Sequence, residues 1–244
     1  MNSKDNVFVI KLADVIIRCS CIFKETASFF DGFIKHSNHD INDTVSIDEY
    51  DKQLWAEKGN ILDAYGEYSL LCGAISDYLM KHNCCLIHAV AFRYKDRAYL
   101  ITGAPGIGKS TQIKYLIDMY PNQFSIICGD RPCLEFKNDG TIFVNPTPWN
   151  GKENWYGAKS CELAGVFCLS RDDYTEISVL SDRLAVMPVF LSLISRHEEE
   201  KDIQLLAQYT ERIVSKYPVF KYVNGGVPSS TVTFYDTINR EVSK

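Results

Sequence analysis

The strongest constraint on the fold is a glycine-rich segment at residues 103–110, Gly-Ala-Pro-Gly-Ile-Gly-Lys-Ser. It matches the pattern G-x-x-x-x-G-K-[ST], whose glycines let the backbone curl so that successive N–H groups point at phosphate oxygens. Such a loop needs a strand before it and a helix after it, and the sequence predicts a strand at 98–102 and a helix at 111–119. The segment therefore predicts an α/β fold that binds a nucleoside triphosphate.

Individual loop residues have distinct expected roles. We expect Lys109 to carry its ammonium group to the β and γ phosphates of ATP, and the Ser110 hydroxyl to bind Mg²⁺. The N-terminus of the following helix adds the positive end of its dipole. The expected nucleotide-binding residues of the loop are Gly103, Ala104, Pro105, Gly106, Ile107, Gly108, Lys109, Ser110 and Thr111.

A triphosphate site also needs an acidic residue beside the metal, usually at the end of a neighbouring strand. The segment Ser125-Ile-Ile-Cys-Gly-Asp130 supplies one after an apolar strand. An ordinary turn aspartate is the alternative interpretation, but the position favours a metal ligand. The predicted Mg²⁺ site consists of Ser110 and Asp130.

Apolar spacing elsewhere predicts a mixed sheet with antiparallel hairpins and flanking helices rather than a purely parallel sheet. We expect an N-terminal extension at 1–83 packed on a core at 84–244, forming one compact unit. The predicted strands are Val7–Phe23 (one or two), Cys85–Tyr94, Arg97–Thr102, Phe124–Cys128, a hairpin around Asn138-Asp139-Gly140, Cys161–Leu169 and Thr175–Leu180. The other predicted helices are Tyr65–His82, Asp182–Ser195, Glu198–Lys216 and, more weakly, Pro228–Val242.

Charge and hydropathy narrow the functional class. The net charge of −5 argues against a nucleic-acid partner, because binding phosphates along a nucleic acid needs a surplus of Lys and Arg. The first residues do not resemble a signal peptide, and no apolar run has the roughly 18 residues that a membrane span requires. We therefore expect a cytoplasmic protein without a membrane partner.

The nine cysteines lack the paired C-x2-C spacing of zinc sites. We interpret them as reduced and mostly buried, behaving as small apolar residues. On strands, adjacent Cys84 and Cys85 are expected to point to opposite faces, and Cys19 and Cys21 to the same face.

The position of the loop excludes several familiar classes, since nucleoside kinases, adenylate kinases and many small GTPases carry it near the N-terminus. Three flanking motifs are informative: Leu86-Ile-His88-Ala-Val, Ile-Ile-Cys-Gly-Asp130-Arg131 and Thr147-Pro-Trp-Asn-Gly-Lys152. With fifteen residues from His88 to Gly103, this arrangement resembles the catalytic domain of the HPr serine kinase/phosphorylase family. It is most similar to the shorter HPr-kinase-like proteins that carry a T-P-W-x-G-K segment. The resemblance covers roughly residues 84 to 180.

The resemblance implies site residues outside the loop. In that family a histidine lies near the phosphates, and an aspartate pair binds magnesium and handles the proton of the acceptor. These roles fall on His88 and Asp130, so the predicted catalytic set is His88, Lys109 and Asp130. The chain departs from the family at Gly129, which stands where the first aspartate is usual. Either Asp130 and His88 divide the two tasks, or activity is weakened.

The T-P-W-x-G-K segment adds further candidates. Lys152 is assigned to the nucleotide-binding set, with a solvated loop lysine as the alternative, and Arg131 is a weaker candidate of the same kind. Trp149 and Trp155 either line an acceptor groove or cap the core.

The implied function is an ATP- and Mg²⁺-dependent kinase that phosphorylates a hydroxyl, namely serine of a peptide or protein such as a ribosomally made peptide precursor. Free L-serine is the alternative small-molecule acceptor. A non-kinase P-loop ATPase is disfavoured because no Asp-Glu pair follows an apolar strand, and Asp48-Glu49 precedes the loop. A catalytically silent nucleotide-binding module stays open because of Gly129. The helix pair between Asp182 and Lys216 is a candidate interaction surface, and a homo-oligomer stays open.

Overall fold

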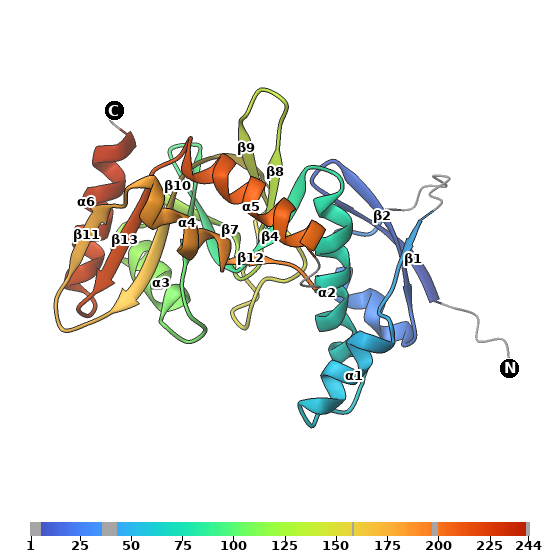
Figure 1. Ribbon diagram of the computed structural model, residues 1–244. Coiled ribbons are helices and arrows are strands. Elements are labelled where there is room, and N and C mark those ends of the chain that lie inside the picture. The colour runs from blue at the N-terminus through green and yellow to red at the C-terminus, as the bar shows by residue number, and fades with distance from the viewer. Residues whose placement is uncertain (1–5, 36–42, 158, 197–199, 243–244) are drawn as a thin grey trace, which may run out of the picture.

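The computed structural model describes residues 6–35, 43–157, 159–196 and 200–242. Over these residues the chain forms a larger sheet of ten strands and a separate sheet of three (Figure 1). The smaller sheet consists of β1 (Asn6–Leu12), β2 (Val15–Cys21) and β3 (Thr44–Val45). The larger sheet consists of β4 (Cys84–Ile87), β5 (Ala89–Tyr94), β6 (Arg97–Thr102), β7 (Phe124–Cys128), β8 (Cys133–Phe136), β9 (Ile142–Asn145), β10 (Cys161–Arg171), β11 (Glu176–Val179), β12 (Leu193–Ile194) and β13 (Val219–Asn224).

The larger sheet is mixed, as predicted. Its strand order is β12-β4-β8-β9-β10-β6-β5-β7, with β13 pairing with both β10 and β11. β10 runs parallel to β6 and β13, whereas the β5–β6 and β8–β9 pairs are antiparallel hairpins. The helices are η1 (Lys24–Phe30, a 3₁₀ helix), α1 (Glu49–Glu57), α2 (Ala64–Met80), α3 (Lys109–Met119), α4 (Asp182–Phe190), α5 (Glu200–Val214) and α6 (Ser229–Val242). The predicted mixed α/β class with flanking helices is confirmed.

Two apolar cores cover the two faces of the larger sheet. Along β5, Val90 and Phe92 join the core that contains residues of α3 and α6, while Ala89 and Ala91 join the core that contains residues of α4 and α5. This alternation follows from the two-residue period of a strand. The phosphate-loop helix α3 is thereby fixed on one face of the sheet.

A third apolar core connects the smaller sheet to the larger one. Ile10 and Ile17 of the smaller sheet, Leu71 and Ile75 of α2, and Leu86 of β4 belong to the same cluster. Figure 1 shows α2 between the two sheets. This packing brings residues from the first third of the chain next to the phosphate-loop region.

The predicted strand Cys85–Tyr94 is wrong in one respect, because it is interrupted at His88. β4 pairs with β8 and β12, whereas β5 pairs with β6 and β7. At the break the His88 N–H donates to the Ser192 carbonyl (2.7 Å) and the Ala89 N–H donates to the Asp130 carbonyl (2.8 Å). These two hydrogen bonds satisfy the backbone N–H groups at the break without a partner strand. The His88 side chain therefore lies at a gap in the sheet.

The C-terminal third differs from the prediction in two places, at the end of α4 and at β13. The helix predicted to Ser195 ends at Phe190, and Leu193–Ile194 instead form β12, which pairs with β4. α5 is described from Glu200, and Glu198 and Glu199 lie outside the described residues. β13 is not among the predicted strands, although it is the parallel neighbour of β10 and most of its residues are buried.

All nine cysteines are free, and all but the partly buried Cys168 are buried. Cys85 belongs to the core on the α4 and α5 side, and Cys84 to the core shared with the smaller sheet. Cys19 and Cys21 share a core. The predicted faces are confirmed.

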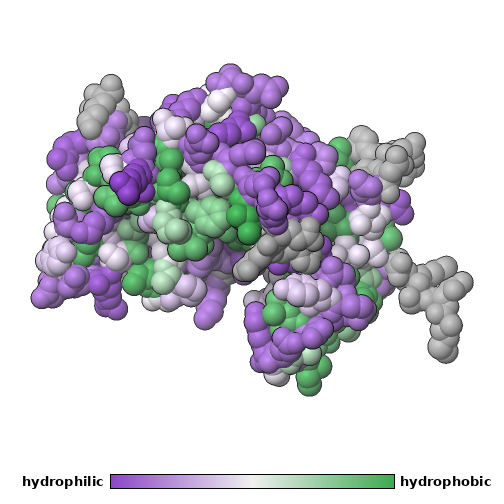
Figure 2. All heavy atoms as spheres, in the orientation of Figure 1, coloured by the Kyte–Doolittle hydropathy of each residue, from purple (hydrophilic) through white to green (hydrophobic). Residues whose placement is uncertain are grey.

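Two further features of the helices are their length and their exposed apolar residues. Over the described residues, no helix combines the length and apolar character needed to cross a membrane. α4 leaves Leu184 and Met187 exposed, Leu191 just after it is exposed as well, and Figure 2 shows apolar surface on this side of the molecule. Whether the helix pair α4–α5 is an interaction surface stays a prediction.

Candidate functional site

The phosphate loop lies between β6 and α3, which is the strand–loop–helix context predicted from the sequence. Gly103, Gly106 and Gly108 have positive φ angles of 149°, 77° and 108°. A Cβ atom at Gly103 would lie 2.5 Å from the carbonyl oxygen of Leu169, so this position also has no room for a side chain. The loop conformation therefore depends on glycine for both backbone geometry and close approach.

Lys109, at the start of α3, folds back over the loop. Its Nζ donates to the carbonyl oxygens of Gly103 (3.0 Å) and Ala104 (3.4 Å) and lies 3.3 Å from Nε2 of His88. Only 8% of the residue is exposed. Burial lowers the pKa of Lys109, and the negative charge of Asp130 partly opposes this effect.

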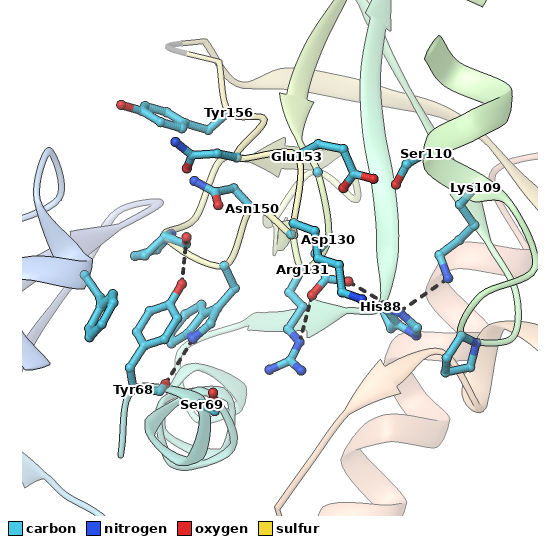
Figure 3. Close-up of a pocket in the computed structure, with 18 of the residues that line it drawn as sticks. Tyr68, Ser69, His88, Lys109, Ser110, Asp130, Arg131, Asn150, Glu153 and Tyr156 are labelled. Atoms are coloured by element: carbon cyan, nitrogen blue, oxygen red, sulfur yellow. Dashed lines mark hydrogen bonds and ion pairs between the residues drawn. The ribbon is translucent and has the colours of Figure 1, made fainter. Parts of the chain in front are cut away.

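Asp130 follows β7 and lies between two nitrogen-bearing side chains. One carboxylate oxygen is 3.4 Å from Nε2 of His88, and the other is 3.3 Å from Nε of Arg131. Burial acts to raise the pKa of Asp130, but the hydrogen bond from His88 and the charges of Arg131 and Lys109 outweigh it, so the pKa is lowered. Asp130 is therefore ionised at neutral pH. Figure 3 shows that His88, Lys109 and Asp130 meet at one place.

Gly129 has no room for the carboxylate that the resembled family carries there. A Cβ atom at this position would lie 2.2 Å from the carbonyl oxygen of Asn150. The Gly129 N–H donates to the Trp155 carbonyl (2.7 Å), which holds the segment 150–155 against it. The close packing of the segment 150–155 therefore requires glycine at position 129, where the resembled family has aspartate.

Glu153 is a site residue that sequence reasoning missed. It lines the same cavity as Asp130, and a Cβ atom at Gly151 would lie 3.4 Å both from Cβ of Asp130 and from Oε2 of Glu153, so Gly151 lies between the two acidic side chains. In Figure 3 the Glu153 carboxylate faces the Ser110 hydroxyl. No motif marks Glu153, since it follows Lys152 in a segment without periodicity.

The oxygen atoms of Ser110, Asp130 and Glu153 fit the preference of Mg²⁺ for hard oxygen ligands. Among the residues that the structure describes, no group of three or more His, Cys, Asp or Glu side chains is arranged to hold a metal ion. This combination fits a cation shared with nucleotide phosphates, which is usually bound through one or two carboxylates, rather than an all-protein metal cage.

The Thr-Pro-Trp segment at 147–149 fastens the site to α2. The Trp149 indole N–H donates to the Tyr68 carbonyl (3.2 Å), and the Tyr68 hydroxyl donates to the Pro148 carbonyl (2.8 Å). The Thr147 hydroxyl donates to the Arg131 carbonyl (2.7 Å), and the Arg131 N–H donates to the Trp149 carbonyl (3.0 Å).

The two tryptophans have mainly packing roles. Trp149 is 3% exposed and stacks on Tyr68, so it caps the third core and presents little surface to the cavity. Trp155 packs against the core on the α3 and α6 side and is not among the residues that line the cavity. Lys152 is exposed at the cavity edge.

These groups share a cavity of about 810 Å³. Of the predicted site residues, the cavity is lined by His88, Pro105, Gly106, Gly108, Lys109, Ser110, Thr111, Asp130 and Lys152. Gly103 and Ala104 contribute carbonyl oxygens to Lys109, and Ile107 packs against the core beneath the loop. The opposite wall comes from the first third of the chain and comprises Ser28, Phe29, Asp31, Phe33, Tyr65, Tyr68 and Ser69.

Comparison with known proteins gives little further guidance. No protein-family model matches the sequence, and no curated protein is detectably similar to it. Among solved structures, the chain is similar to the HPr(Ser) kinase/phosphatase from Coxiella burnetii, with a TM-score of 0.36 and 14% sequence identity. The match covers 65% of this chain and 97% of that one. A likeness of this size carries no argument about function, which depends here on the site residues themselves.

Proposed function

We propose that this protein is an ATP- and Mg²⁺-dependent kinase that transfers the γ-phosphoryl group to a hydroxyl, namely serine of a peptide or protein. The observation that carries the proposal is the meeting of Lys109, His88 and Asp130 beside the phosphate loop, with contacts of 3.3 and 3.4 Å. The serine acceptor is inferred from the family that the sequence motifs resemble.

Nucleotide binding is assigned to the loop and to Lys109. Loop N–H groups and the α3 N-terminus receive the phosphates, because both present positive partial charge. The Lys109 ammonium leaves the Gly103 and Ala104 carbonyls and turns to the β and γ phosphates. Binding thereby gives this buried cation a full counter-charge.

Ser110 and Asp130, with Glu153 as an additional carboxylate, are the residues that would hold Mg²⁺. When bound, the cation neutralises charge on the phosphate oxygens. Glu153 then supplies, from a different segment, the second carboxylate that an aspartate at position 129 would provide.

The transfer step needs a proton acceptor, and the Asp130–His88 pair is placed to provide it. The acceptor hydroxyl oxygen forms a bond to the γ phosphorus while the bond from that phosphorus to the β–γ bridging oxygen breaks, releasing ADP. The hydroxyl proton passes to the Asp130–His88 pair. Arg131 and His88 each hold one oxygen of Asp130, so the carboxylate is oriented before the acceptor arrives.

A water-activating ATPase is the main rival. The kinase is favoured because the cavity extends from the loop to a second wall on η1 and α2, which leaves room for an acceptor other than water. Free L-serine remains the alternative acceptor, and a silent nucleotide-binding module is the alternative without catalysis.

The experiment is ADP release from Mg²⁺-ATP by purified protein, alone and with serine peptides or free L-serine, for wild type and Lys109→Ala. We expect release that depends on an acceptor and is lost in the variant. Equal release without an acceptor would establish an ATPase, and nucleotide binding without any release would establish the silent module. Unchanged release by Lys109→Ala would overturn the assignment of the site.

A further inference from the structure

The wall opposite the phosphate loop carries a cluster of aromatic rings that the chemistry above does not use. We call Phe29, Tyr65 and Tyr68 the aromatic ledge. The ring of Phe29 stacks on Tyr68 at 4.9 Å between centroids and meets Tyr65 edge-on at 5.9 Å. Phe29 is 39% exposed and Tyr65 is 60% exposed, although both line the cavity. Two large rings thus present open surface to the space beside the reacting groups.

The aromatic ledge is held firmly with respect to Asp130. Tyr68 is fixed by its two hydrogen bonds to the 148–149 segment, and that segment is bonded to the Arg131 backbone. The Phe29 side is fixed as well, because the Glu67 carboxylate of α2 accepts from the Ile22 and Phe23 N–H groups (2.7 and 3.1 Å) just before η1. Rings that are preorganised in this way bind a partner at low entropic cost.

Charge on this wall disfavours an acceptor with a carboxylate next to its hydroxyl. Among the wall residues that the structure describes, Asp31 is the one charged side chain. The cations of the cavity lie elsewhere: Lys109 on the loop, Arg131 paired with Asp130, and Lys152 on the segment 150–155. Free serine would find a partner for its ammonium group in Asp31 but none for its carboxylate among the described wall residues, whereas an apolar side chain would find a matching surface.

We propose that the aromatic ledge binds an apolar or aromatic side chain next to the phosphorylated serine of a polypeptide acceptor. The inference rests on the proposed function and names the acceptor class for the same site. Figure 3 shows why a chain-like acceptor fits: Tyr68 on α2 and Lys109 on the loop lie on opposite sides, with Asp130 and Arg131 between them. An acceptor must reach Asp130 with its hydroxyl while another group contacts the aromatic ledge.

The test uses short synthetic peptides that share one serine and differ only in the neighbouring residue, which is Phe, Leu, Ala or Asp, together with free L-serine. Phosphoryl transfer gives KM and kcat, and fluorescence anisotropy of labelled peptides in the presence of ADP gives binding without chemistry. The variants are Phe29→Ala/Tyr65→Ala, the single variant Tyr65→Ala in case the double variant does not fold, and Tyr174→Ala as a control. Tyr174 is similarly exposed but does not line the cavity.

We expect the Phe and Leu peptides to have the lowest KM, and the double variant to raise that KM about tenfold, equivalent to about 1.4 kcal/mol, without changing kcat. Tyr174→Ala should keep the preference. Equal KM for all peptides, better use of free L-serine, or an unchanged preference in both ledge variants would overturn the inference while leaving the kinase assignment intact. Peptide binding that depends on the aromatic ledge without any transfer would instead defeat the kinase and uphold the ledge as a binding site.

Discussion

Nε2 of His88 lies 3.4 Å from a carboxylate oxygen of Asp130, although the two residues lie at the ends of different strands. His88 occupies the gap between β4 and β5, and Asp130 follows the end of β7. The backbone joins the same two places, since the Ala89 N–H donates to the Asp130 carbonyl at 2.8 Å. The pair is therefore set by the main chain as well as by the side chains.

Replacing Asp130 tests the electrostatic role of the pair. Since the pKa of Asp130 is lowered in the folded protein, its ionised form stabilises the fold above the unfolded-state pKa of about 3.9. This contribution is lost as the pH falls through the folded-state pKa. Asp130→Asn should therefore have a smaller free energy of unfolding than wild type at pH 7, and the two should converge in the acid range.

Urea unfolding measured from neutral to acid pH checks this prediction, with His88→Ala as a companion that removes the ring nitrogens. Loss of the His88 hydrogen bond should raise the pKa of Asp130 and move the loss of stability to higher pH. A difference between Asp130→Asn and wild type that does not change with pH would contradict the assignment.

Removal of the Lys109 charge should stabilise the empty protein. Burial lowers the pKa of Lys109, so holding it charged costs stability at neutral pH, and the cost disappears only as pH rises through the lowered pKa toward the ordinary value of about 10.4. Lys109→Met should raise the Tm at pH 7 and lose the Tm increase that Mg²⁺-ATP gives the wild type. Lys114→Met, at an exposed position of the same helix, should change neither property. A lower Tm for Lys109→Met would show that its carbonyl contacts outweigh the cost of burial.

Placing at Gly129 the aspartate of the family that the sequence motifs resemble should destabilise the protein. Because a Cβ atom would lie 2.2 Å from the Asn150 carbonyl oxygen, Gly129→Asp must displace the segment 150–155 and should lower the free energy of unfolding by about 2–4 kcal/mol. Gly59→Ala shows the cost of backbone strain without a steric clash, since Gly59 has a φ of 76° and open space around it, and it should cost about 1–2 kcal/mol. Urea unfolding measures both. A Gly129→Asp protein as stable as wild type would refute the steric explanation.

Glu153 should contribute to the affinity of the site for a divalent cation. Glu153→Gln removes a carboxylate from the cavity that Ser110 and Asp130 line while keeping the side-chain shape, so the affinity for Mn²⁺ in the presence of ADP should fall about tenfold. Electron paramagnetic resonance of bound Mn²⁺ measures this without turnover. Glu211→Gln, on an exposed part of α5, controls for the loss of one negative charge. Equal Mn²⁺ affinity for both variants would remove Glu153 from the metal site.

Local patterns in the sequence were sufficient for the parts of the fold that depend on short-range signals. The loop, α3, α2 and the two hairpins follow from glycine spacing, helical periodicity and turn residues. The break at His88 could not be read in this way, because residues 84–94 form a nearly continuous apolar run and the interruption depends on hydrogen bonds to Ser192 and Asp130. β12 and β13 likewise owe their conformation to distant strand partners.

The site was predictable to the extent that its residues belong to motifs. The loop pattern itself predicts the roles of Lys109 and Ser110. The role of Asp130 was predicted from its position after a strand, and that of His88 from the family resemblance. Glu153 and the aromatic ledge carry no motif, and they reach the cavity only because α2 and the segment 147–155 pack together. Long-range packing of this kind leaves no periodic trace in a single sequence.

The most direct test of the central claim is the transfer of label from γ-labelled ATP to a serine peptide by wild type, Asp130→Asn and Lys109→Ala, with phosphoserine identified by mass spectrometry. We predict phosphoserine with wild type, a rate about 100-fold lower with Asp130→Asn despite retained nucleotide binding, and none with Lys109→Ala. Label recovered only as inorganic phosphate, or phosphoserine formed equally by all three proteins, would contradict a kinase centred on Lys109, His88 and Asp130.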